Sequence, residues 1–120
     1  MANIFIVEDE LTIQHLYKEF LTAMGFNIIG MASNGKKAVE LFKSFKNKPK
    51  IIIMDYRLPI KNGLEVSKEI LNLEENTKII FATADNSISK EALSIGVFSV
   101  KVKPFSLTCL LNVIEEALKE

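Results

Sequence analysis

The chain has 120 residues, 48% of them apolar, and 15 lysine and arginine residues balance 15 aspartate and glutamate residues. That length suits one domain with its own core. The balanced charge excludes a basic nucleic-acid-binding module, which would carry a net positive charge. The single cysteine, Cys109, excludes an internal disulfide, so we expect a reducing, cytoplasmic setting. No apolar run approaches the roughly 18 residues of a membrane span, so we expect neither membrane insertion nor a signal peptide.

The first half of the chain alternates short apolar runs with stretches of helical spacing. Residues 4–7, 26–31 and 51–54 are rich in β-branched and aromatic side chains, which predicts buried strands. Between them, helices are predicted over residues 13–24 and 36–45, where apolar side chains recur every three or four positions. The apolar stripe of the first helix comprises Ile13, Leu16, Tyr17, Phe20, Leu21 and Met24.

The second half continues the same alternation. Apolar spacing predicts helices over residues 64–73 and 89–95, and the short runs at 79–81 and 97–102 predict two further strands. A last helix begins at Ser106, a residue type that caps helix N-termini well.

Strands that are apolar along their whole length need cover on both faces, as in a parallel sheet between two layers of helices. Five predicted strands alternate with five predicted helices, which indicates one doubly wound α/β domain over residues 1–120. In such a sheet, ligands bind beyond the carboxyl ends of the strands. The residues at those ends are therefore the candidates for function.

Charged and hydroxyl side chains follow four of the predicted strands. Glu8 and Asp9 follow the first strand, Asp55 the third, Thr83 the fourth and Lys103 the fifth. If the first and third strands are neighbours, at least three carboxylates meet at one edge, where like charges repel. A hard cation with oxygen ligands relieves that repulsion, and Mg²⁺ suits a site of this kind.

Acidic residues at strand ends also have a plain structural interpretation, as solvated loop residues or as partners of the next helix N-terminus. We assign Glu10 to that class, as a carboxylate in the first turn of the helix that follows. Asp55 is different because it comes directly after four apolar residues, so its backbone emerges from the core.

Four segments in order, each at the end of a predicted strand, resemble the motifs of one family. They are Ile6-Val7-Glu8-Asp9-Glu10, Met54-Asp55-Tyr56-Arg57-Leu58-Pro59 with Asn62-Gly63, Ala82-Thr83-Ala84, and Lys103-Pro104-Phe105. Over essentially its whole length, the chain resembles the receiver domain of two-component response regulators, of the stand-alone type. The resemblance implies a flavodoxin-like (βα)5 fold with a five-stranded parallel sheet in the order 2-1-3-4-5.

The resemblance also implies roles for the residues at the strand ends. Asp55 would be the phosphoacceptor, whose carboxylate attacks phosphorus and becomes an acyl phosphate. The implied Mg²⁺ ligands are Glu8, Asp9, Asp55 and the backbone carbonyl of Arg57. The metal would offset the charge of the incoming phosphoryl oxygens.

Two more residues complete the implied site. Lys103 would pair with a phosphoryl oxygen, and Thr83 would donate its hydroxyl to another and move inward. The switch would then alter the face formed by the fourth helix, fifth strand and fifth helix, which a target protein reads. A histidine kinase or a phosphotransfer protein would be the donor, and no nucleic acid would bind directly. We expect no enzyme activity beyond self-catalysed phosphorylation and dephosphorylation of the aspartate.

The chain departs from the family pattern at three places. Val100 stands where an aromatic residue usually swings inward with the threonine, and its β-branched side chain has little reach. Lys101 occupies a position of the fifth strand that is usually apolar. Arg57, the only arginine, and Asp85 lie at the rim of the site in this family. We hypothesise that they pair across its mouth and alter phosphoryl lifetime.

Three other functions compete with this one. A degenerate receiver that only docks partners is the main alternative, because of Val100. An aspartate-nucleophile phosphatase would carry a second aspartate two residues after the nucleophile, where this chain has Arg57. A flavodoxin-like FMN carrier would need a phosphate-binding loop after the first strand, and Glu8-Asp9-Glu10 would repel a phosphate there.

Overall fold

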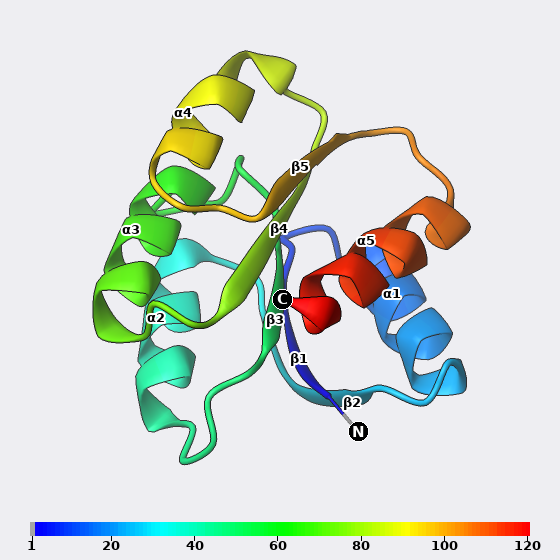
Figure 1. Cartoon of the computed structure of the whole chain (residues 1–120). Helices are drawn as coiled ribbons and strands as arrows, with labels where there is room; N and C mark the ends of the chain where they lie inside the picture. Colours follow the sequence, from blue (N-terminus) through cyan, green and yellow to red (C-terminus); the bar gives the residue numbers. More distant parts are fainter. Residues whose placement is uncertain (1) are drawn as a thin grey trace.

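The computed structural model describes residues 2–120 and contains a five-stranded sheet between two layers of helices. Helices α2, α3 and α4 cover one face of the sheet, and α1 and α5 cover the other (Figure 1). In chain order the elements are β1 (Asn3–Val7), α1 (Leu11–Ala23), β2 (Asn27–Ala32), α2 (Gly35–Ser44), β3 (Ile51–Met54), α3 (Gly63–Leu73), β4 (Lys78–Thr83), a 3₁₀ turn (Asn86–Ile88), α4 (Ser89–Ser94), β5 (Ser99–Val102) and α5 (Leu107–Lys119).

All neighbouring strands of the sheet are parallel, and their order is β2-β1-β3-β4-β5. This order confirms the doubly wound α/β fold. The central strands β1 and β3 are buried on both faces, since residues 4–7 and 51–54 are at most 1% exposed. Strands of continuous apolar sequence are stable here because a helical layer removes each face from water.

Two separate apolar clusters hold the layers to the sheet. Phe5, Phe42 and Phe81 belong to the cluster beneath α2, α3 and α4. Ile6 and Ile53 belong to the cluster beneath α1 and α5. Because successive side chains of a strand point to opposite faces, each apolar strand supplies both clusters at once.

The predicted apolar stripe of α1 is wrong at two positions. Leu16 is 48% exposed and Met24 is 47% exposed, whereas the polar Gln14 is 5% exposed. The stripe that faces the sheet is narrower than the sequence pattern, since its buried members are Gln14, Tyr17 and Leu21. Two apolar side chains therefore lie on the solvent flank of the helix.

The apolar runs also overestimate the lengths of two strands, β2 and β5, which begin later than predicted. Phe26 lies in the turn that ends α1, where its amide donates to the Leu21 carbonyl. Val97 lies in the turn after α4, where its amide donates to the Ala92 carbonyl. Each turn contains a glycine with positive φ, Gly25 at 94° and Gly96 at 107°. Left-handed glycines of this kind end helices, so the following apolar residue completes the helix stop before the strand begins.

A close backbone approach fixes the loop between β3 and α3. Asn62 caps α3 in a reciprocal capping box with Glu65, and the Gly63 amide donates to the Tyr56 carbonyl at 2.7 Å. A Cβ atom at Gly63 would collide with the carbonyl oxygen of Asp55 and would lie 2.9 Å from the Tyr56 Cα. Glycine at this position therefore allows the helix to begin directly beside the strand end.

No helix within residues 2–120 combines the length and the apolar character needed to cross a membrane.

We predict that Gly63→Ala lowers the free energy of unfolding by about 2 kcal/mol, because a backbone obstacle cannot move aside as a side chain can. Urea unfolding of the two proteins measures the difference. Gly30→Ala is the matched control, since the nearest obstacle to a Cβ there is the ring of the half-buried Phe45, at 2.9 Å, and the Phe5 ring at 3.6 Å is at ordinary contact distance. Equal losses in the two variants would contradict this account of Gly63.

Candidate functional site

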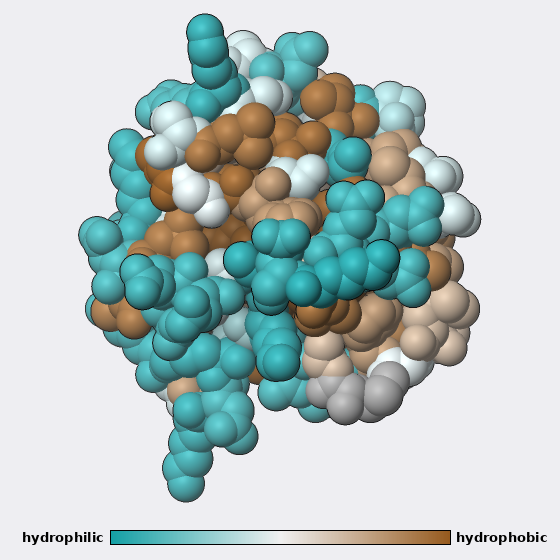
Figure 2. Space-filling model, viewed as in Figure 1, coloured by the Kyte–Doolittle hydropathy of each residue, from teal (hydrophilic) through white to brown (hydrophobic). Residues whose placement is uncertain are grey.

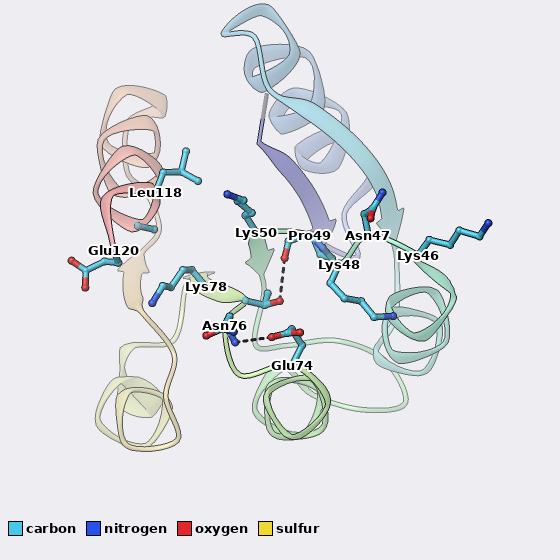
Figure 3. A pocket seen from close by; sticks show the side chains of 12 residues that line it. Lys46, Asn47, Lys48, Pro49, Lys50, Glu74, Asn76, Lys78, Leu118 and Glu120 are labelled. Atoms are coloured by element: carbon cyan, nitrogen blue, oxygen red, sulfur yellow. Dashed lines mark hydrogen bonds between the residues drawn. The ribbon is translucent and has the colours of Figure 1, made fainter.

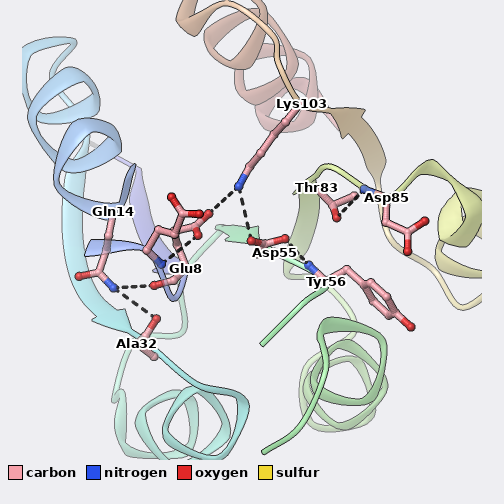
Figure 4. A network of polar contacts seen from close by, with 9 residues as sticks. Glu8, Gln14, Ala32, Asp55, Tyr56, Thr83, Asp85 and Lys103 are labelled. Atoms are coloured by element: carbon pink, nitrogen blue, oxygen red, sulfur yellow. Dashed lines mark hydrogen bonds and ion pairs between the residues drawn. The ribbon is translucent and has the colours of Figure 1, made fainter. Parts of the chain in front are cut away.

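The candidate site lies at the carboxyl edge of the sheet, where β1 and β3 run side by side. The register pairs Val7 with Met54, and the Asp55 amide continues the ladder by donating to the Val7 carbonyl at 3.0 Å. The residues that follow the two strands, Glu8 and Asp55, are therefore brought together by the backbone itself (Figure 4).

Glu8, Asp9 and Asp55 each place a carboxylate oxygen within 4.8 Å of those of the other two. Glu8 and Asp55 are buried, at 1% and 9% exposure, and Asp9 faces solvent. Three hard oxygen donors, one of them accessible from water, fit a divalent cation such as Mg²⁺, which keeps several of its waters. The predicted gathering of these three residues is confirmed.

Lys103 extends from the segment after β5 into the same cluster. Its Nζ lies 2.9 Å from Glu8 Oε1 and 3.4 Å from Asp55 Oδ2, as Figure 4 shows. The Lys103 amide donates to the Thr83 carbonyl at 2.7 Å, which prolongs the β4–β5 ladder by one residue. The Lys103–Pro104 peptide bond is cis.

Burial and charge act in opposite directions on this ion pair. Burial raises the pKa of the Glu8 carboxyl above its usual value, although the hydrogen bond from Lys103 opposes that rise. Burial lowers the pKa of the Lys103 ammonium, but its hydrogen bond to Glu8 and the charges of Asp55 and Glu8 outweigh burial and raise that pKa. The lysine therefore stays charged and is the counter-ion of the two carboxylates.

Thr83 ends β4 and is fully buried. Its Oγ1 accepts a hydrogen bond from the Asp85 amide at 3.2 Å, so in this state the hydroxyl is bound within its own loop. Asp55 Oδ1 accepts from the Tyr56 amide at 2.7 Å. Asp55 directly follows β3 and Thr83 is the last residue of the neighbouring β4, so both lie at the predicted edge, and each is hydrogen-bonded to the backbone of the adjoining loop.

Arg57 and Asp85 form the predicted pair at the rim of the site. Arg57 Nη2 lies 3.2 Å from Asp85 Oδ2, with the arginine side chain 75% exposed and the aspartate side chain 19% exposed. Hydrogen bonds from Ser87 lower the pKa of the Asp85 carboxyl, and the Arg57 charge adds to that effect. The pair joins the loop after β3 to the loop after β4.

One polar side chain beside the site, Gln14, does not follow from the sequence patterns. Gln14 is buried beneath the β1–α1 loop, and its Nε2 donates to the Glu8 carbonyl at 2.9 Å. Tyr17 lies one turn further along α1, and burial raises its pKa to about 12. The polarity of Gln14 inside a helix whose buried face is otherwise apolar was the available signal. Its position opposite strand-end carbonyls could not be read from spacing.

Glu10, Val100 and Lys101 lie around the site rather than within the acidic cluster. Glu10 is the N-cap residue of α1, so the prediction that places it in the first turn of that helix is wrong. Its side chain makes no capping bond in the described structure, and its amide donates to Glu8 Oε2 at 3.1 Å. Val100 pairs with Phe81 in the β4–β5 ladder and packs partly buried against the core. The neighbouring Lys101 is half-buried.

A hollow of about 730 Å³ lies at the opposite edge of the sheet from the acidic cluster (Figure 3). Lys50 and Lys78 from the starts of β3 and β4 line it together with Glu74 and Glu120. Lys48 Nζ donates to the carbonyls of Phe42, Lys43 and Phe45 at the end of α2, so this lysine serves as a helix cap. The residues that line this hollow are therefore not the ones for which the sequence predicts a chemical role.

Comparison with known proteins agrees with this geometry. The response regulator receiver domain family matches residues 4–115. The chemotaxis protein CheY of Thermotoga maritima is 32% identical over 98% of both chains, and Protein CcdB of Bacillus subtilis is 30% identical over the same share.

Solved structures show the same fold. The response regulator TrrA of Thermotoga maritima, solved in complex with Mg²⁺ and BeF, superposes with a TM-score of 0.87 at 32% identity and covers 98% of this chain and 99% of its own. CheY in the CheX–CheY–BeF₃–Mg²⁺ complex of Borrelia burgdorferi gives a TM-score of 0.92 at 25% identity, over 98% of this chain and 89% of that one. With its strand order, its acidic cluster and the family match over residues 4–115, the chain belongs to the receiver domains of two-component response regulators.

Proposed function

We propose that the chain is a phosphorylation-driven switch that accepts a phosphoryl group on Asp55. The observation that carries the proposal is the gathering of Glu8, Asp9 and Asp55 at one strand edge with Lys103 against two of them. An Asp55 oxygen forms the bond to phosphorus while the bond to the donor breaks, and the electron pair leaves with the donor. The donor is a histidine kinase or a phosphotransfer protein.

The three carboxylates and the Arg57 carbonyl are the residues that would hold Mg²⁺. When bound, the metal neutralises the charge of the transferring phosphoryl group. Asp9 is the carboxylate that faces solvent, so it is the first that a hydrated ion meets. Support for the metal also comes from the Mg²⁺-containing structures of two related receivers.

Lys103 supplies the positive charge for the phosphorylated state. It bridges Glu8 and Asp55 before phosphorylation, and an ammonium is a compact charge that can exchange one oxygen partner for another. Phosphorylation of Asp55 adds oxygens that compete with Glu8 for this lysine. Since Lys103 follows β5 directly, its change of partner alters the end of that strand.

A target protein would read the change on the α4–β5–α5 face. Apolar surface gathers over β5 and the adjoining part of α4 in Figure 2, and Leu93 and Val102 are 52% and 41% exposed there. Because Val100 cannot reach as an aromatic side chain does, the change is carried by the Thr83 loop and the β5 end rather than by a large ring movement. We propose no turnover of an external substrate.

We predict that acetyl phosphate adds one phosphoryl group to the protein only when Mg²⁺ is present, and that Asp55→Asn abolishes the gain because the amide is not a nucleophile. Intact-mass spectrometry measures the gain. Glu115→Gln removes one exposed carboxylate from α5 and is the matched control. Absence of labelling in the wild type, with no fluoroberyllate complex formed, would favour the alternative of a docking module that works without phosphorylation.

We predict that Lys103→Met lowers the free energy of unfolding by about 2 kcal/mol at neutral pH, because it leaves the Glu8 carboxylate buried without its partner. The loss shrinks as the pH falls through the raised pKa of Glu8, since protonation removes the unpaired charge. Urea unfolding at several pH values measures it. Glu8→Gln in the same chain should remove most of the loss, and a loss independent of both pH and Glu8 would contradict the pairing.

We predict that Arg57→Ala shortens the lifetime of the phosphorylated protein severalfold, because the Arg57–Asp85 pair closes the mouth of the site against water. Decay of the phosphorylated mass after removal of acetyl phosphate measures the lifetime. Lys61→Ala, which breaks the partly exposed ion pair between the same loop and Glu69 of α3, is the control. An unchanged lifetime in Arg57→Ala would show that the pair does not guard the acyl phosphate.

A further inference from the structure

Gln14 is a buried polar residue that connects the ends of two strands. Its side-chain Nε2 donates to the Glu8 carbonyl at 2.9 Å and, more weakly, to the Ala32 carbonyl at 3.4 Å. Both acceptors lie at the carboxyl edge, the first just after β1 and the second at the end of β2. Figure 4 shows the Gln14 amide directed at the backbone of Glu8 and Ala32.

The backbone of Gln14 holds the other side of the same loop. Its amide donates to the Glu10 carbonyl at 2.9 Å in the first turn of α1. Gln14 therefore binds both neighbours of Asp9, through its side chain on one side and its main chain on the other. Asp9 itself extends into solvent between these two anchors.

The cost of burying an amide indicates that these bonds matter. Gln14 is 5% exposed, and an apolar side chain at this position would avoid the loss of hydration that a buried amide incurs. Both bonds of its donor nitrogen go to strand-end carbonyls rather than to other side chains. The residue therefore acts on the direction of the loop and contributes no ligand atom to the cluster.

We propose that Gln14 is a positioning residue for the cation site, which sets the directions of the Glu8 and Asp9 carboxylates by anchoring the backbone on both sides of Asp9. The inference rests on the proposed function, because it assumes that Mg²⁺ binds the cluster. Residues that orient metal ligands without touching the metal commonly contribute about tenfold or more to affinity. Loss of the amide should therefore weaken Mg²⁺ binding while the fold is kept.

The test compares Gln14→Met with His15→Met in the full chain. Methionine keeps the length of Gln14 but has no donor, and the same change at the adjacent, exposed His15 is the matched control. Calorimetric titration with MgCl₂ gives the dissociation constant, and thermal unfolding with and without MgCl₂ gives the stabilisation by the metal. We expect Mg²⁺ to bind about tenfold more weakly to Gln14→Met, and as tightly to His15→Met as to the wild type.

Each outcome separates this inference from the proposed function. If the wild type binds Mg²⁺ and Gln14→Met binds it equally well, the inference is wrong and the site stands. If the wild type binds no Mg²⁺, both are wrong. If Gln14→Met is unfolded in buffer, the titration is repeated at low temperature in trimethylamine N-oxide, which favours the folded state. A chain that stays unfolded even there contradicts the inference, because Gln14 would then be required for the fold itself.

Discussion

Repulsion among three carboxylates at one strand edge is the constraint on which the rest of the site depends. Unit charges 4 Å apart repel by about 4 kcal/mol at an effective dielectric constant of about 20, and the oxygens of Glu8, Asp9 and Asp55 lie within 4.8 Å of one another. The apolar burial of β1 and β3 is what overcomes this repulsion. Lys103 offsets part of it, and the remaining negative charge is what suits the edge to the proposed cation.

The counter-ion comes from the far end of the chain. Lys103 is 95 residues from Glu8, and it reaches the cluster because β4 and β5 extend the sheet in parallel register as far as Thr83 and Val102. The charge change that we propose at Asp55 would reach the end of β5 through this one ammonium group. The same ion pair that makes the acidic edge tolerable thus links it to the α4–β5–α5 face.

The α/β fold and the position of most site residues at the carboxyl edge could be predicted from local sequence patterns, whereas the strand order and the residue roles were implied by the resemblance to receiver domains. Continuous apolar runs specify buried parallel strands, and residues directly after such runs must lie at the carboxyl edge. Gln14, Leu16 and Met24 could not be placed in this way. Whether a residue on the flank of α1 is buried depends on how that helix sits over the edge of the sheet, and the partners of Gln14 are backbone carbonyls of two different strands.

Two ion pairs at the same edge have different consequences because they lie at different depths. The Arg57–Asp85 pair is exposed, and pairs of this kind contribute about 0–1 kcal/mol to stability. Any effect that it has must therefore be on access to Asp55 rather than on folding. The Lys103–Glu8 pair has a carboxylate with only 2% of its side chain exposed, and removing either partner leaves a desolvated charge. Loss of the deeper pair therefore costs stability, whereas loss of the outer pair costs the fold little.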